Sequence, residues 1–133
     1  MLRRRWASGD RQGRFIAILL GVLTLNRPIA AQTVGNPLDK IQFSLMAIDA
    51  DGLIGSGTGK RSQAYEFCLP AEQQATVRVL DPSLQLSQSP GRVNCKQGEF
   101  LAIGETHQPQ WRSILINLAR LPYVESIVPH WGE

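Results

Sequence analysis

A short apolar run behind a cluster of arginines is the feature that most limits what this chain can fold into. The run, residues 15–25, holds eleven residues without a charge, and five arginines precede it within the first 14 residues. A helix needs roughly 20 apolar residues to cross a bilayer, so this run is too short for a stable membrane anchor. A basic segment followed by a short apolar one is typical of a secretory signal peptide, which is removed from the mature protein.

Small residues after the apolar run indicate where the signal peptide ends. Pro28 breaks a continuing helix, and Ala30 and Ala31 have the small side chains that signal peptidase requires. We expect cleavage between Ala31 and Gln32, with export to the periplasm or secretion and no membrane anchor afterwards. The chain then has three parts, which are a signal peptide at residues 1–31, a flexible tether at residues 32–40 and a single domain at residues 41–133.

Removal of the signal peptide reverses the sign of the charge. The whole chain has 14 lysines and arginines against 11 acidic residues. Residues 1–31 contain six of the arginines and one aspartate, which leaves eight bases (14 less 6) and ten acids (11 less 1). Binding to nucleic acid depends on a clustered positive surface. We therefore expect no nucleic-acid partner.

Both cysteines of the chain, Cys68 and Cys95, lie in the predicted domain. Two thiols in a small domain of an oxidising compartment most simply form a disulfide. Their spacing is too long for a Cys-X-X-Cys redox pair, and apolar residues lie close to both, Phe67 and Leu69 beside Cys68 and Val93 near Cys95. We expect a buried, structural and chemically inert bond.

Apolar periodicity predicts the secondary structure of the domain. Alternation indicates strands, and a spacing of three and four indicates helices. The clearest helix lies between Pro109 and Pro122, because apolar residues recur at the i, i+3, i+4 and i+7 positions from Trp111. The other expected elements are strands at 41–48, 64–69, 83–88, 93–103 (with a bulge at 97–98) and 123–128, and a helix at 71–80.

From residue 64 onward the expected order is strand, helix, strand, strand, helix, strand. This is the order of the ferredoxin-like (split βαβ) arrangement. We expect an α+β fold, a small antiparallel sheet with two helices on one face, preceded by an extra N-terminal strand at residues 41–48. The first and third strands of the arrangement are antiparallel neighbours, which brings the end of one, at Cys68, to the start of the other, at Cys95.

Two segments resemble ligand-binding loops but lack the residues that such loops need. The glycine-rich segment at residues 55–62 has Ile54 and Arg61 where a phosphate-binding loop needs a glycine and a hydroxyl. The acidic turn at residues 49–52 lacks the first and twelfth ligands of a calcium loop. We interpret both as turns and expect no metal site and no cofactor.

His107 is the strongest candidate for a catalytic group. It lies just before the clearest helix, where backbone N–H groups favour an anion. Glu66 could orient it as a general base, and Arg92 could hold a negatively charged substrate; Glu105 and Arg112 are the alternatives for these two roles. These residues would make the protein a small periplasmic or secreted hydrolase.

A binding function is the interpretation that we favour over this hydrolase. No serine, cysteine or metal ligand has a spacing that is diagnostic of catalysis, so the catalytic residues, if the protein has any, are unknown. We expect a non-catalytic module that binds a protein or a small molecule. Trp131, near the C-terminus, is either an exposed contact for that partner or part of a tail folded against the sheet.

Overall fold

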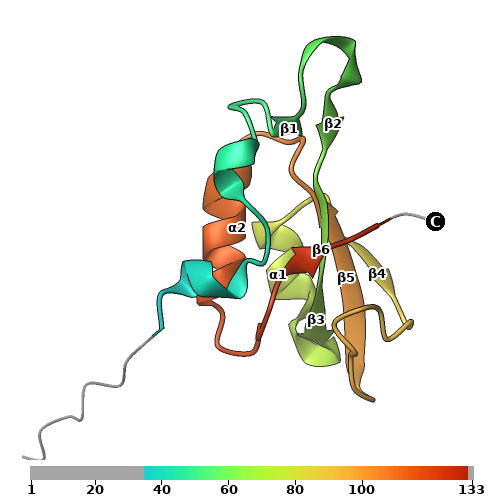
Figure 1. Cartoon of the computed structure of the whole chain (residues 1–133). Helices are drawn as coiled ribbons and strands as arrows, with labels where there is room; N and C mark the ends of the chain where they lie inside the picture. The colour runs from blue at the N-terminus through green and yellow to red at the C-terminus, as the bar shows by residue number, and fades with distance from the viewer. Residues whose placement is uncertain (1–34, 132–133) are drawn as a thin grey trace, which may run out of the picture. The chain divides into compact units, whose positions relative to one another are not determined.

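The computed structural model describes residues 35–131 of the chain (Figure 1). The predicted signal peptide, its cleavage site between Ala31 and Gln32, and the first residues of the tether lie outside this range. Within it, neither helix is long and apolar enough to cross a bilayer.

An antiparallel sheet of four strands organises the fold (Figure 1). Its two long strands, β3 (Ala64–Pro70) and β5 (Glu99–Glu105), are seven residues each and pair along their whole length. The short strand β4 (Gln85–Ser87) pairs with β5, and β6 (Val128–Pro129) pairs with β3. The order across the sheet is therefore β4-β5-β3-β6.

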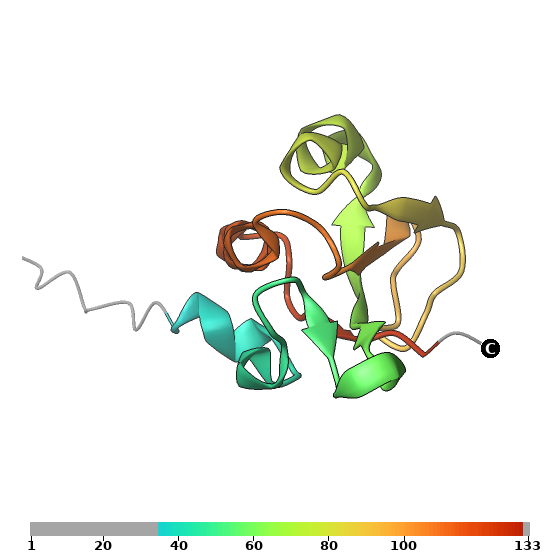
Figure 2. The ribbon, with the colours of Figure 1, turned by 90° about the horizontal axis from the view of Figure 1, so that it is seen from above.

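The two predicted helices are present and lie on the same side of the sheet (Figure 2). The first consists of a 3-10 turn, η4 (Ala71–Gln73), and α1 (Gln74–Leu80). The second, α2 (Trp111–Arg120), buries the predicted apolar stripe. The described chain is thus an α+β fold with two helices, a four-stranded antiparallel sheet and a two-stranded hairpin.

The core lies between α2 and one face of the sheet. Alternate residues of a strand point to opposite faces, and Tyr65, Phe67 and Leu69 of β3 are fully buried in one cluster with the apolar side chains of α2. Glu66 and Cys68 therefore point to the other face of the sheet. The structure covers that face with a loop, as described below.

The predicted N-terminal strand at residues 41–48 is wrong. The segment holds a 3-10 turn, η2 (Leu45–Ala47), and it follows another, η1 (Pro37–Lys40), which takes up the end of the predicted tether. Only Ile41 and Ile48 make β-bridges, and these are isolated. The alternating Ile41, Phe43 and Leu45 do contact the core, but the 3-10 turn that begins at Leu45 interrupts the extended backbone and leaves Met46 94% exposed.

Three further strands are shorter than predicted, and the one expected at residues 83–88 is limited to β4. The third strand of the predicted order begins at Glu99 rather than at residue 93, because Gly91, Asn94 and Gly98 have left-handed backbone conformations that no regular strand contains. The last strand is limited to β6, since a turn closed by the bond from the Val124 N–H to the Leu121 carbonyl precedes it.

The acidic turn and the glycine-rich segment form a hairpin, β1 (Leu53–Ile54) and β2 (Arg61–Ser62), with η3 (Gly57–Gly59) at its tip. The Asp49 carboxylate accepts hydrogen bonds from the N–H groups of Asp51 and Leu53, and it lies 3.0 Å from the Lys60 ammonium. The Leu53 N–H and then Lys60 lower the pKa of Asp49, and Asp49 in turn raises the pKa of Lys60. These groups thus stabilise the turn itself.

Candidate functional site

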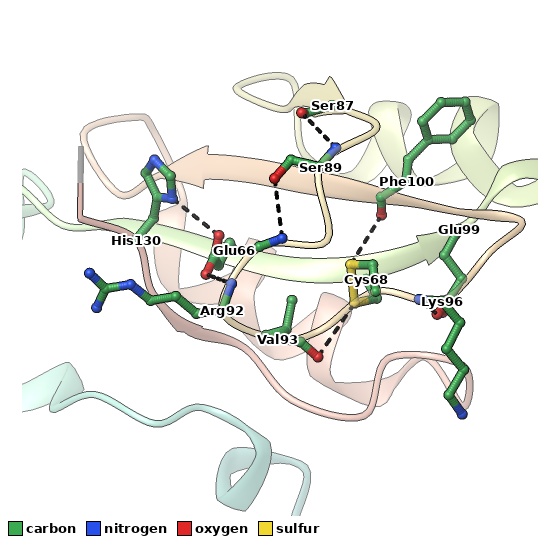
Figure 3. The surroundings of a disulfide bond; sticks show 12 residues. Glu66, Cys68, Ser87, Ser89, Arg92, Val93, Lys96, Glu99, Phe100 and His130 are labelled. Carbon is green, nitrogen blue, oxygen red and sulfur yellow. Dashed lines mark hydrogen bonds and ion pairs between the residues drawn. A yellow bond between two sulfur atoms is a disulfide. The ribbon is translucent and has the colours of Figure 1, made fainter. Parts of the chain in front are cut away.

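A disulfide attaches a loop to the face of the sheet that the helices leave free (Figure 3). Cys68 and Cys95 are bonded, as predicted, with their Cα atoms 5.3 Å apart. The expected location across neighbouring strands is wrong, because Cys95 lies in residues 89–98, which we call the disulfide loop, and Leu101 is the β5 partner of Cys68. Cys68 points away from the helices, so a loop on that side can reach it.

Both cysteines are half-buried rather than fully enclosed. The carbonyl oxygens of Val93 and Phe100 lie 3.9 and 3.8 Å from the sulfurs of Cys68 and Cys95. A disulfide sulfur has no hydrogen to donate, so these are packing contacts. They show that the bond is flanked by backbone of the loop and of β5.

Glu66 is buried beneath the disulfide loop, with 1% of its surface exposed. One carboxylate oxygen accepts a hydrogen bond of 2.9 Å from the backbone N–H of Arg92, and the other lies 3.2 Å from Nδ1 of His130 (Figure 3). A buried carboxylate is tolerated only when such partners satisfy it. This one carboxylate therefore connects three segments: β3, the disulfide loop and the C-terminal tail.

Gly91 allows the loop to approach the sheet this closely. Its φ is +62°, and a Cβ atom at this position would lie 2.5 Å from the Leu101 side chain and 3.0 Å from the Glu66 carboxylate. Only glycine adopts this conformation without a steric cost and leaves the space free.

Arg92 and Trp131 meet above this buried contact. The Arg92 side chain points away from Glu66 (Figure 3), and its guanidinium carbon lies 5.8 Å from the centroid of the Trp131 ring. A cation over an indole face is attracted by the ring quadrupole. Trp131 is nevertheless 53% exposed, so much of the ring can still meet a ligand.

A shallow groove of about 300 Å³ lies beside Trp131. His130 and Trp131 form one wall, and residues 61–64 at the end of the hairpin form the other. Arg61 is exposed there, and the Ser62 hydroxyl lies 3.4 Å from the Glu105 carboxylate. The groove therefore combines an aromatic side chain with basic and polar groups. We call Arg61, Arg92, His130 and Trp131 the Trp131 surface.

The three weak catalytic candidates are not brought together. Glu66 and Arg92 lie side by side, but through the Arg92 backbone and not through its guanidinium. His107 is exposed, and its Nδ1 lies 3.0 Å from the Asp51 carbonyl oxygen, at the acidic turn. In residues 35–131, the polar contacts of His107 thus involve neither of the other two candidates.

The alternative helpers of His107 also have other partners. Glu105 lies next to Ser62, and the Arg112 guanidinium lies 5.0 Å from the centroid of the Trp111 ring. The predicted catalytic group therefore remains a single exposed imidazole at the start of α2.

A buried polar network around Asp81 escaped the sequence analysis. Asp81 is fully buried, and it accepts hydrogen bonds from the Tyr65 hydroxyl, from the Ser83 hydroxyl at 2.7 Å and from the Gln108 amide at 3.0 Å. Burial, and then the charge of Asp81, raises the pKa of Tyr65 far above its usual value. The sequence shows only an aspartate that ends a helix. Nothing in it indicates that Asp81 contacts Tyr65, 16 positions earlier, or Gln108, 27 positions later.

In the part of the chain that the structure describes, no group of three or more His, Cys, Asp or Glu side chains is placed to hold a metal ion. Comparison of the chain with family models, with curated proteins and with solved structures finds no match. The fold and the Trp131 surface are therefore the observations that indicate the class of the protein.

Proposed function

We propose that this chain is an exported, non-catalytic binding protein whose ligand contacts the Trp131 surface. The observation that carries the proposal is the buried Glu66 carboxylate. It binds the backbone N–H of Arg92 in the disulfide loop and the side chain of His130, the residue before Trp131. A surface that is already ordered before binding loses little conformational entropy when the ligand arrives. Tryptophan and arginine are also the residues that most often dominate binding energies.

The chemistry of the titratable groups supports binding rather than catalysis. A general base must reach a proton of the substrate. Glu66 is covered by the loop, and both of its oxygens already have partners. His107, the base of the hydrolase alternative, has an exposed ring, but its polar neighbour among the described residues is a backbone carbonyl and not a carboxylate.

Export is part of the proposal. The basic and apolar segments within residues 1–31 support a signal peptide that is cleaved after Ala31. The disulfide supports an oxidising compartment, the periplasm or the exterior.

We also propose that the domain has the ferredoxin-like arrangement from β3 onward. The four strands, numbered from β3, lie in the order second, third, first, fourth, and all neighbours are antiparallel. That spatial order, together with a helix after the first and third of these strands, supports the proposal.

Ligand capture that depends on Trp131 tests the function. The secreted form is immobilised and exposed to the extracytoplasmic material of the cells that produce it, and retained molecules are identified by mass spectrometry. We expect at least one component to be lost with Trp131→Ala and retained with Met46→Ala, which removes a more exposed apolar side chain, on η2. The same retained set for all three proteins would contradict the proposal, as would a hydrolytic activity that His107→Ala abolishes.

A further inference from the structure

We infer that the ligand of the Trp131 surface is an acidic polysaccharide whose rings are uronic acids. The inference rests on the proposed function, and it adds the chemical class of the ligand. Three observations carry it: the half-exposed indole, two arginines without an acidic partner, and the size and lining of the groove.

The indole ring of Trp131 suits a sugar ring. Pyranose rings present a flat face of C–H groups, and such a face packs well on an aromatic ring of similar size. Trp131 is 53% exposed, lines the groove, and is held at its position by the neighbouring His130, whose N–H donates to the Ala64 carbonyl at 2.9 Å. An aromatic side chain fixed in this way offers a stacking platform without needing to be ordered by the ligand.

The charges of the surface favour a carboxylate. The contacts between basic and acidic side chains found in residues 35–131 are Lys60 with Asp49 and His130 with Glu66, so Arg61 and Arg92 have no acidic partner there. Two acids lie close to this surface. Glu66 is buried and has partners on both oxygens, whereas Glu105 is exposed and its carboxylate lies 3.4 Å from the Ser62 hydroxyl. A guanidinium binds a carboxylate through two parallel hydrogen bonds, and a uronic acid carries one carboxylate per ring.

The groove itself fits one sugar ring of a longer chain. Its volume of about 300 Å³ lies at the small end of the range for ligand sites. Ser62 and Gln63 also line the groove. The Ser62 hydroxyl lies 3.4 Å from the Glu105 carboxylate and the Gln63 amide donates to the Ala64 carbonyl, so a sugar hydroxyl would bind beside these contacts. The groove is open to solvent rather than enclosed.

A lipid surface fits the same residues less well. Interfacial binding requires an extended apolar face together with several basic residues. The other strongly exposed apolar side chains are Met46 on η2 and Val79 on α1, which belong to other elements than the Trp131 surface.

Calorimetric titration of the secreted form at physiological salt tests the inference. The probes are hexamers of galacturonate and of mannuronate and a glucuronate-containing hyaluronan oligomer. Maltohexaose serves as the neutral sugar, hexaglutamate as a linear polyanion, and vesicles with phosphatidylglycerol as the lipid. Trp131→Ala, Arg61→Gln and Arg92→Gln are compared with Arg78→Gln, which removes the same charge from an exposed position on α1.

We expect at least one uronate oligomer to bind, and each of the three surface variants to weaken that binding about tenfold or more. Arg78→Gln should change it by less than about twofold, as expected of a distant surface charge. Neither maltohexaose nor hexaglutamate should compete. Circular dichroism and an intact disulfide establish that each variant is folded.

Three results would overturn the inference. Failure of all three uronate oligomers to bind excludes the ligand class, whereas Trp131-dependent capture of another molecule would still support the proposed function. If hexaglutamate bound as tightly as the uronate oligomers, the binding would depend on charge attraction alone and not on a sugar ring. Binding to the anionic vesicles alone, lost in Trp131→Ala, would identify a membrane contact in place of the sugar.

Discussion

Glu66 has a structural role that its residue type alone does not indicate. The sequence analysis named it as a helper of His107, but the structure places it under the disulfide loop with Arg92 and His130 as partners. A carboxylate that loses its hydration on folding must be satisfied by such donors. The structure thus gives Glu66 partners other than His107, the residue that the sequence analysis expected it to orient.

Tyr65 makes the alkaline stability of the protein dependent on one buried hydroxyl. Burial and the neighbouring Asp81 raise its pKa, so the folded protein keeps the proton that an unfolded tyrosine loses near pH 10. The stabilisation is fully present below that pH and is lost as the pH rises further, by about 1.4 kcal/mol per pH unit. Urea unfolding of wild type and Tyr65→Phe at pH 8, 9.5 and 11 measures this loss.

The variant should be less stable at pH 8, because it lacks the bond to Asp81, and the difference should shrink between pH 9.5 and 11. Comparing the two proteins cancels the contributions of the other tyrosine and of the lysines. A difference in unfolding free energy that stays constant with pH would show that Tyr65 ionises as freely in the folded protein as in the unfolded chain.

At the scale of elements, the disulfide loop depends on its covalent bond. Cys68 and Cys95 are 27 residues apart, and closing a loop of this size restricts the unfolded chain. Replacing both cysteines with serine should lower the free energy of unfolding by about 2–5 kcal/mol, the usual loss for a small secreted domain. Trypsin provides a local measurement, because the loop contains Arg92 and Lys96.

Cleavage at these two positions should be faster in the double serine variant than in wild type, while α2, which also contains an arginine at position 112, should remain intact. Equal cleavage rates in the loop would mean that the sheet holds it without the disulfide.

The hairpin and the end of β5 meet at Gly52, where a side chain has no room. Its φ is +80°, and a Cβ atom would lie 1.8 Å from the Thr106 carbonyl oxygen. Gly57 is the matched control, since its φ is +59° with nothing within 4 Å of a Cβ atom. Gly57→Ala should cost only the backbone strain of about 1–2 kcal/mol, and Gly52→Ala distinctly more. Thermal unfolding compares the two variants; equal losses would show that the hairpin shifts freely away from Thr106.

The elements that were predicted correctly are those in which the apolar residues recur with the period of a strand or a helix, because one set of side chains packs into the core. β3 and α2 have long, regular periods because each packs against the same core. The segment at residues 41–48 shows the same alternation because Phe43 and Leu45 pack against the core beside Ile41, but its backbone forms a 3-10 turn and only isolated bridges. Of the candidate site, Trp131 and Arg92 could be named from the sequence, but their contact depends on a tail and a loop that are 39 positions apart.

For the whole molecule, the proposed export would determine which form of the chain works. Removal of residues 1–31 would leave eight bases and ten acids, and from this composition we expect no binding to nucleic acid. Intact-mass measurement of the secreted protein should give an N-terminus at Gln32 or within about two residues of it, as expected of a cleaved signal. Full-length protein in the membrane fraction would instead identify the apolar run as an anchor.

We conclude that Glu66 holds the disulfide loop and the C-terminal tail together, so that Arg92 and Trp131 form one surface. Amide hydrogen exchange at Arg92 tests it most directly, because this N–H donates to the Glu66 carboxylate at 2.9 Å. We expect the Arg92 amide of wild type to exchange about a hundredfold more slowly than an unstructured amide. In Glu66→Ala this protection should be lost, while the amide of Ala102 in β5 stays protected. An Arg92 amide that exchanges at the unstructured rate in wild type, or that stays protected in Glu66→Ala, would contradict the account.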